Sequence, residues 1–178
     1  MKKVCIIIGH GGNDFGAWNK RTKENELEYN TDLAKTVAQK LKEAGFDTFA
    51  HNRGYGKMEN IGFINSNSPD VIISLHCNAA TGTATGTEML HWHTSKNGKK
   101  LASCVQEEVL KALGLRDRGI KEKKLGDRGA GLLKSTKAPC IILEPFFIDN
   151  DNDLKIGKEK KNEYAEAIVN GIVKYFEC

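Results

Sequence analysis

The chain has 178 residues, an ordinary hydrophobic content of 39% and a net charge of +4. This length fits a single domain spanning residues 1–178 with a core large enough to fold unaided, and no apolar run reaches the ~18 residues of a membrane-spanning helix. The lysines are scattered and not interleaved with aromatic residues, which argues against a nucleic-acid partner and leaves at most a weak attraction to a polyanionic surface.

The cysteines and the first residues bear on where the protein is made. Five cysteines are far apart and include no Cys-x-x-Cys pair: Cys5, Cys77, Cys104, Cys140 and Cys178. This pattern argues against a disulfide framework or a zinc ribbon and favours synthesis in a reducing cytoplasm. The apolar stretch near the start, Val4–Ile8, is shorter than the roughly 7–15 residues of a signal-peptide core. We therefore expect no signal peptide and a first β-strand instead.

A histidine within a glycine-rich turn follows this first strand. In Gly9–Gly12 the glycines let the backbone bend away while the ring of His10 stays at the strand end. A bystander histidine and a metal ligand are both compatible with this turn. A phosphate-binding loop fits less well, because neither Gly-x-Gly-x-x-Gly nor Gly-Lys-Ser/Thr is present.

The next segment predicts an amphipathic helix that ends at Gly45. Its apolar face repeats every three or four residues, through Asn30, Leu33, Ala34, Val37, Ala38, Leu41 and Ala44. The first turn carries Glu24, Glu26 and Glu28, and acids there can simply complement the helix dipole. Glu26 alone extends the inward stripe, so it is the carboxylate that we expect to face the sheet.

A buried strand is predicted at the centre of the chain. It follows a predicted strand over Phe46–Ala50 and a predicted short helix over roughly Met58–Ser66. Val71–Leu75 is a nearly continuous β-branched run, typical of a strand buried on both faces. The run ends in His76, and alternation points the neighbouring Cys77 to the other side.

The following segments are predicted mainly from alternation and periodicity. A strand over Thr87–His93 puts His91 and His93 on one face. A second metal site is conceivable there, but an exposed face of a half-solvated strand is the favoured interpretation. Leu101–Leu113 predicts a helix, and Leu115–Lys124 a charged, solvated loop.

Towards the end of the chain, Gly129–Leu133 is a candidate edge strand, and the polar run Asp149–Asn152 predicts a loop before a last helix over Tyr164–Tyr175. Between them lies the apolar run Pro139–Leu143, followed directly by Glu144. Burying a carboxylate is costly unless the group is paired or has a chemical role. Glu144 is therefore a candidate functional residue.

Three predicted buried strands thus end at His10, His76 and Glu144. If the strands are parallel neighbours, these side chains meet at one edge of the sheet, where open α/β sheets carry their sites. His10, Glu26 and His76 supply the two histidines and one carboxylate that hydrolytic zinc takes, with a position left open for water. Glu144 suits the separate acid/base that moves the proton from water to the departing amine. The set is complete for metal-assisted amide hydrolysis.

The chain also resembles a known family through motifs that span residues 9 to 150. The matching segments are Gly9–Ala17, Asn25-Glu26, Tyr29-Asn30, Leu33-Ala34, Ser74–Ala79, Arg118-Gly119 and Ile141–Asn150. In this order they resemble the zinc-dependent N-acetylmuramoyl-L-alanine amidases, the branch of bacterial cell-wall amidases and phage endolysin catalytic domains.

This resemblance implies a fold, a reaction and residue roles. The implied fold is α/β, a single catalytic domain with a twisted mixed sheet of about six strands and helices on both faces. The implied roles are Zn²⁺ ligands for His10, Glu26 and His76, and acid/base for Glu144. The implied substrate is peptidoglycan, cut between N-acetylmuramic acid and L-alanine. The family often adds a cell-wall-binding domain, and we expect none here. Asn78 and Arg118 are expected near the site without an assigned role.

Two alternatives stay open alongside this hypothesis. One is another zinc peptidase, such as a carboxypeptidase acting on stem peptides, since the ligand set does not exclude it. The other is a non-catalytic wall-binding protein of the same fold, although an unpartnered buried Glu144 would then only burden stability. We further expect a monomer that meets membranes only indirectly. Without a signal peptide, it would reach the wall as a phage or prophage lysin released by a membrane-permeabilising partner.

Overall fold

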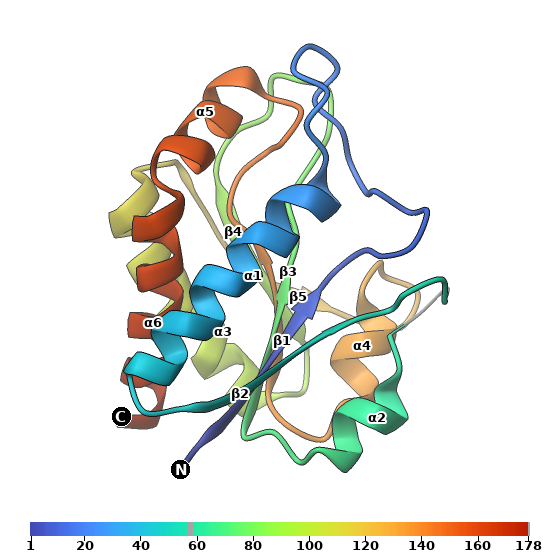
Figure 1. Cartoon of the computed structure of the whole chain (residues 1–178), viewed down its shortest axis with the longest axis vertical. Helices are drawn as coiled ribbons and strands as arrows, with labels where there is room; N and C mark the ends of the chain where they lie inside the picture. Colours follow the sequence, from blue (N-terminus) through green and yellow to red (C-terminus); the bar gives the residue numbers. More distant parts are fainter. Residues whose placement is uncertain (57–58, 178) are drawn as a thin grey trace.

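A mixed β-sheet forms the centre of the protein (Figure 1). The computed structural model describes residues 1–56 and 59–177, and within them six strands follow the order β2-β1-β3-β6-β4-β5. The parallel neighbours are β2 (Asp47–Asn52), β1 (Lys3–Ile8), β3 (Val71–Leu75) and β6 (Cys140–Glu144). β4 (Thr87–Trp92) runs antiparallel to β6, and β5 (Asp117–Lys123) lies parallel to β4. The predicted α/β fold with a mixed sheet of about six strands is confirmed.

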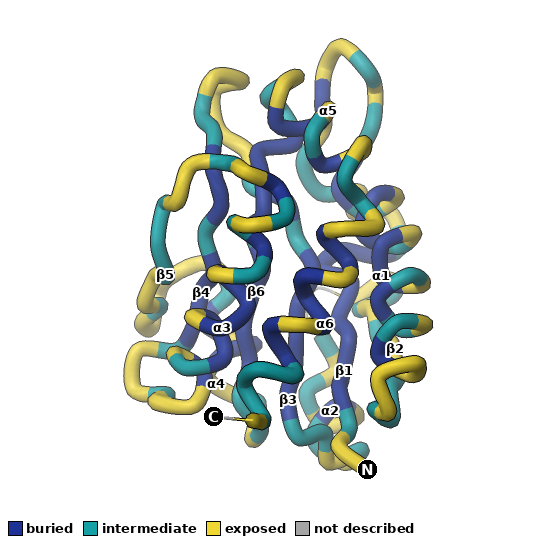
Figure 2. Tube along the Cα trace, turned by 90° about the vertical axis from the view of Figure 1, so that its left-hand side faces the viewer, coloured by how far each residue is buried: buried dark blue, intermediate teal, exposed yellow. Residues whose placement is uncertain are grey.

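The three strands with apolar runs lie side by side in the middle of the sheet. β1, β3 and β6 are buried along nearly their whole length, and their traces run dark blue in Figure 2. Continuous burial requires a cover on both faces of the sheet, which is why these strands do not alternate between apolar and polar residues. The predicted parallel adjacency of these strands is confirmed.

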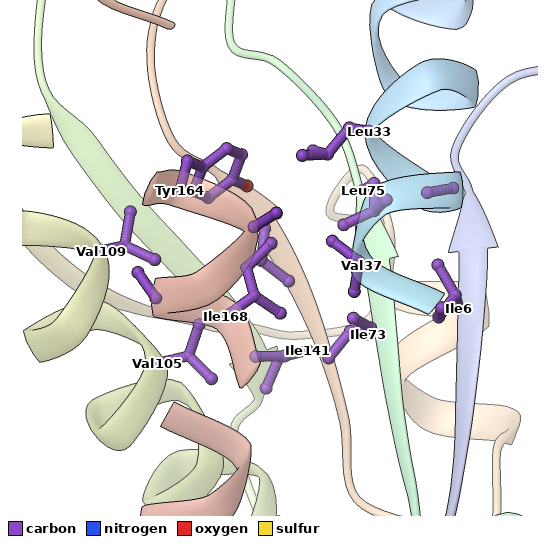
Figure 3. Packing of buried hydrophobic residues seen from close by; sticks show 14 of the residues in the cluster. Ile6, Leu33, Val37, Ile73, Leu75, Val105, Val109, Ile141, Tyr164 and Ile168 are labelled. Atoms are coloured by element: carbon purple, nitrogen blue, oxygen red, sulfur yellow. The ribbon is translucent and has the colours of Figure 1, made fainter. Parts of the chain in front are cut away.

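One face of the sheet, here called the thick face, is covered by long helices: α1 (Glu26–Glu43), α3 (Lys96–Leu113) and α6 (Lys161–Glu177) (Figure 1). α5 (Asp151–Glu159) precedes α6. In Figure 3, Ile168 of α6 lies among Val105 of α3 and Ile73 and Ile141 of the sheet. The larger part of the hydrophobic core is on this side.

In the part of the chain that the structure describes, the opposite face, here called the thin face, carries only two six-residue helices. These are α2 (Ile61–Ser66) and α4 (Ala130–Ser135). The core cluster on this side is small and includes Ile64 of α2, Leu132 of α4 and Ile142 of β6. Among the described residues, no helix is long and apolar enough to cross a bilayer.

The segments at the sheet edge and after β6 differ from the sequence predictions. Leu115–Lys124 was expected to be a solvated loop, but most of it forms β5, an edge strand with one neighbour, where charged residues are tolerated. Gly129–Leu133 was expected to be an edge strand, but Gly129 turns the chain at φ +84° and α4 follows. The polar run Asp149–Asn152 contains the start of α5, because Asn150 caps the helix through Asn152 N and Asp153 N.

Smaller corrections concern β4 and the expected element ends. His91 was predicted on an exposed face, yet it is buried together with Met89 under the thick face, whereas His93 is exposed as expected. α3 covers this part of β4, so the strand is not half-solvated. β2 extends to Asn52, and the start proposed for the α2 segment, Met58, lies outside the described residues.

Cys5, Cys77, Cys104 and Cys140 are buried and form no disulfide with one another. The fifth, Cys178, is not among the described residues.

Candidate metal centre and cleft

The carboxyl ends of β1, β3 and β6 are level with one another. Ile8 pairs with Leu75, and Leu75 pairs with Leu143. The ladder continues one residue further, because Gly9 N donates to Leu75 O and His76 N donates to Leu143 O, each at 3.1 Å. His10, His76 and Glu144 therefore leave the sheet at the same edge, as the sequence predicted.

Glu26 reaches this edge from the first residue of α1. Asn25 caps the helix by accepting from Glu28 N, and the carboxylate of Glu26 is 1% exposed. Its Oε1 accepts from Cys77 N at 2.9 Å, and its Oε2 accepts from Ala17 N at 3.1 Å. Two backbone donors thus hold both carboxylate oxygens in a fixed orientation.

The two histidines lie on either side of this carboxylate. His76 Nδ1 is 2.9 Å from Glu26 Oε1, and His10 Nε2 is 3.2 Å from Glu26 Oε2. Burial by itself would raise the pKa of Glu26, but the two rings outweigh it and hold the pKa well below its usual range. The carboxylate is therefore anionic at neutral pH.

The three residues fit a metal ion. One donor atom from each of His10, Glu26 and His76 lies within 4.8 Å of the others, and no other group of three or more potential ligands occurs in the part of the chain that the structure describes. His10 Nε2 is buried and makes no well-formed hydrogen bond with a described residue. A Cβ on Gly9 would lie 2.1 Å from His76 Nε2, and one on Gly16 would lie 2.7 Å from Glu26 Oε2. Glycines thus leave the space that these side chains need.

Asp14 and Arg53 lie behind His10, and the sequence did not single them out. His10 Nδ1 is 3.1 Å from Asp14 Oδ2 and 3.3 Å from Arg53 Nη2, and Arg53 also forms an ion pair with Asp14. A carboxylate against the second ring nitrogen orients a histidine and raises its basicity as a ligand. Asp14 follows His10 by four residues in the glycine-rich turn, which is the signal that could have identified it.

Glu144 stands beside this group at the end of β6. Its side chain is half-buried, and its Oε2 is shielded from solvent and finds no hydrogen-bond partner among residues 1–56 and 59–177. Burial first, and the negative charge of Glu26 second, raise the pKa of Glu144 to about 8, although Arg128 and Lys123 oppose the rise. Such a carboxylate exchanges a proton near neutral pH, as an acid/base requires.

A cleft of about 330 Å³ on the thin face connects these groups. It runs from His10 and His76 past Glu144 to Lys123 and Arg128. A buried anion shared by two histidines, with a carboxylate of raised pKa in the same cleft, is compatible with metal-assisted hydrolysis.

Comparison with known proteins assigns the chain to a family. The family model described as N-acetylmuramoyl-L-alanine amidase matches residues 4–174. The chain belongs to the N-acetylmuramoyl-L-alanine amidase family. This is a family of hydrolases, so the chain is grouped with enzymes.

Individual relatives of this amidase family are similar over nearly the whole chain. YqiI of Bacillus subtilis, described as uncharacterized, is 32% identical over 99% of this chain and 85% of its own length. The N-acetylmuramoyl-L-alanine amidase LytC of the same organism is 31% identical over 97% of this chain. LytC is much longer, and the match covers only 35% of its length. The crystal structure of an N-acetylmuramoyl-L-alanine amidase from Clostridium difficile 630 superposes with a TM-score of 0.84, at 30% identity, covering 99% of this chain and 97% of that one.

A second network in the amidase cleft involves Asn78 and Arg118, whose roles the sequence left open. Glu88 of β4 lies directly opposite Glu144 in the antiparallel ladder. Its Oε1 accepts from Asn78 Nδ2 at 2.9 Å, and its Oε2 accepts from Arg118 Nε at 2.8 Å. The Arg118 guanidinium lies 4.9 Å from the centre of the Phe147 ring. Asn78 and Arg118 therefore hold the Glu88 carboxylate, which the sequence analysis did not single out. Glu88 and Leu90 are two residues apart on β4 and so share a face, and this spacing could have placed Glu88 on the cleft side.

Proposed function

We propose that this chain hydrolyses the amide bond between N-acetylmuramic acid and L-alanine in peptidoglycan, with Zn²⁺ held by His10, Glu26 and His76. The carrying observation is the buried Glu26 carboxylate between two histidines, with Glu144 at the adjacent strand end. Family membership supports the reaction, and the donor set supports the metal.

The chain's own residues divide the chemistry between them. A bound zinc ion lowers the pKa of its water towards about 7 and polarises a carbonyl group. Glu26 and Asp14 fix the orientation of the two imidazole rings. Glu144 Oε2 takes the proton from the attacking water and passes it to the amide nitrogen as the C–N bond breaks and the C–O bond forms. A pKa near neutrality lets Glu144 act in both directions.

Digestion of purified peptidoglycan tests the reaction. Mass spectrometry should find a new L-alanine amino terminus and an intact disaccharide; chelation should abolish this product, and zinc should restore it. Cuts only within the stem peptide would favour the zinc-peptidase alternative. Binding to the wall without any cleavage would favour a non-catalytic wall-binding protein.

Replacing the acid/base tests the residue role. Glu144→Gln should lower kcat by about 10²–10⁴-fold, because the loss of general acid/base catalysis has that magnitude, while the zinc content stays at the wild-type level. Glu122→Gln removes an exposed carboxylate of β5 and is the matched control. Undiminished activity of Glu144→Gln would reject the assigned role.

We also propose that the protein acts as a monomeric phage or prophage lysin that is made in the cytoplasm and reaches the wall when a partner permeabilises the membrane. The support for this route is the sequence resemblance to phage endolysin catalytic domains, together with five scattered cysteines that favour synthesis in a reducing cytoplasm. Expression in the native host with and without such a partner tests it. Appearance of the intact protein outside the cell before lysis would contradict it.

A further inference from the structure

The cations around the cleft fall into two kinds. Arg118 is paired with Glu88, and Arg53 is paired with Asp14. Lys123 and Arg128 both line the cleft, and within the described residues neither side chain has an ion-pair or hydrogen-bond partner. The end of the cleft beyond Glu144 therefore presents two positive charges that form no ion pair with the carboxylates lining the same cleft.

The backbone brings Arg128 against the cleft. Gly129 has φ +84°, and a Cβ there would lie 2.5 Å from Ile142 Cδ1, so glycine lets the chain approach β6 this closely without displacing Ile142. Gly131 also lines the cleft, and between the charged groups its wall is apolar, formed by Leu90, Leu132 and Ile142. A ligand that fits this end combines an aliphatic portion with at least one negative charge.

The two halves of the proposed substrate, the sugar and the stem peptide, differ in charge and in aliphatic content. An N-acetylated sugar is neutral and polar, whereas a stem peptide carries small aliphatic side chains and free carboxylates. Glu59, Glu88 and Glu144 in the same cleft would repel a carboxylate that entered without cations beside it. Arginine binds carboxylates through paired hydrogen bonds, and lysine adds a point charge.

Resting on the proposed function, we propose that Lys123 and Arg128 bind a carboxylate of the stem peptide, so that the peptide half of the substrate lies over the thin face beyond Glu144. The scissile amide then lies between this pair and the proposed zinc ligands, within reach of Glu144. Lys123 and Arg128 would then select substrates by the negative charge of the peptide and not by its length.

Two synthetic muramoyl peptides test the inference. One carries a free carboxylate on the residue after alanine, and the other carries the same group as a neutral amide. The double variant Lys123→Gln/Arg128→Gln should raise KM for the acidic peptide about tenfold, the scale of partly exposed charge-assisted contacts. Its KM for the amidated peptide should change less than twofold. Any change of kcat, which would follow from the loss of two cations beside Glu144, should be the same for both peptides.

Exposed cations outside the cleft provide the control. Lys124→Gln and Arg116→Gln remove the same charges from positions that do not line it, so KM should keep its wild-type values for both peptides. An equal change of KM for both peptides, or no change for either, would overturn the inference while the proposed function stood. Wild-type protein that cleaves neither peptide would overturn the proposed function and this inference with it.

Discussion

The two faces of the sheet use the same strands for different purposes. In β6, Ile141 and Leu143 face three long helices on the thick face, where the apolar row continues to the strand end. Ile142 faces the thin face, and the next residue on that side, Glu144, is a carboxylate in an open cleft. The larger hydrophobic core lies on one face, which leaves the other thinly covered and accessible to a substrate. Glu26 joins the two, since α1 belongs to the thick face and its first residue reaches the rim.

The largest effect is expected where the two faces meet. Glu26→Ala should lower zinc affinity by more than about 100-fold, because removal of an outer-shell partner alone costs 10–100-fold, and amide hydrolysis should be lost with it. Zinc content after dialysis and calorimetric titration measure this. Glu28→Ala, an exposed acid in the same helical turn, is the control and should bind zinc normally. Full zinc occupancy in Glu26→Ala would show that α1 contributes no ligand.

A core truncation on each face tests the division of stability. Ile168→Ala on the thick face should lower the free energy of unfolding by about 4 kcal/mol, since the side chain is fully buried between helices and sheet. Leu132→Ala on the thin face should cost about 2 kcal/mol, because the six-residue α4 can shift to fill the space. Urea unfolding measures both values. Equal losses would mean that the two faces are equally rigid.

The smallest effect concerns the approach of α4 to the sheet. Gly126 and Gly129 both have left-handed φ angles, but a Cβ on Gly126 meets nothing within 4 Å. Gly126→Ala should therefore lower the free energy of unfolding by about 1 kcal/mol, through backbone strain alone. Gly129→Ala should lower it by about 1 kcal/mol more, because the Ile142 side chain must also move. Thermal unfolding of the two variants gives this difference. Identical midpoints would show that the thin face yields without cost.

The parts of the fold that were predictable are those with dense apolar patterns. β1, β3, β6 and α1 carry runs or stripes that only buried elements satisfy, so His10, His76 and Glu144 could be placed at one edge. The inward orientation of Glu26 could be predicted because it lies on the same face of α1 as the buried apolar residues. β5 was missed because an edge strand needs no apolar run, and the start of α5 was missed because its capping residues resemble a loop.

The parts of the site that were not predictable depend on contacts between distant segments. Arg53 meets Asp14 across two loops, and Glu88 meets Asn78 and Arg118 from three separate elements. No local periodicity carries such information. Their partners become apparent only when the register of the sheet is known.

The proposed ligands come from residues 10, 26 and 76, and they converge only after β1, α1 and β3 have assembled. An unfolded chain offers no such set, so any ion bound there favours the native state, by about 2.7 kcal/mol at a free concentration one hundred times its dissociation constant. The resistance of this protein to heat and proteolysis would then track the supply of zinc around it, and a loaded molecule would outlast an empty one in the same medium.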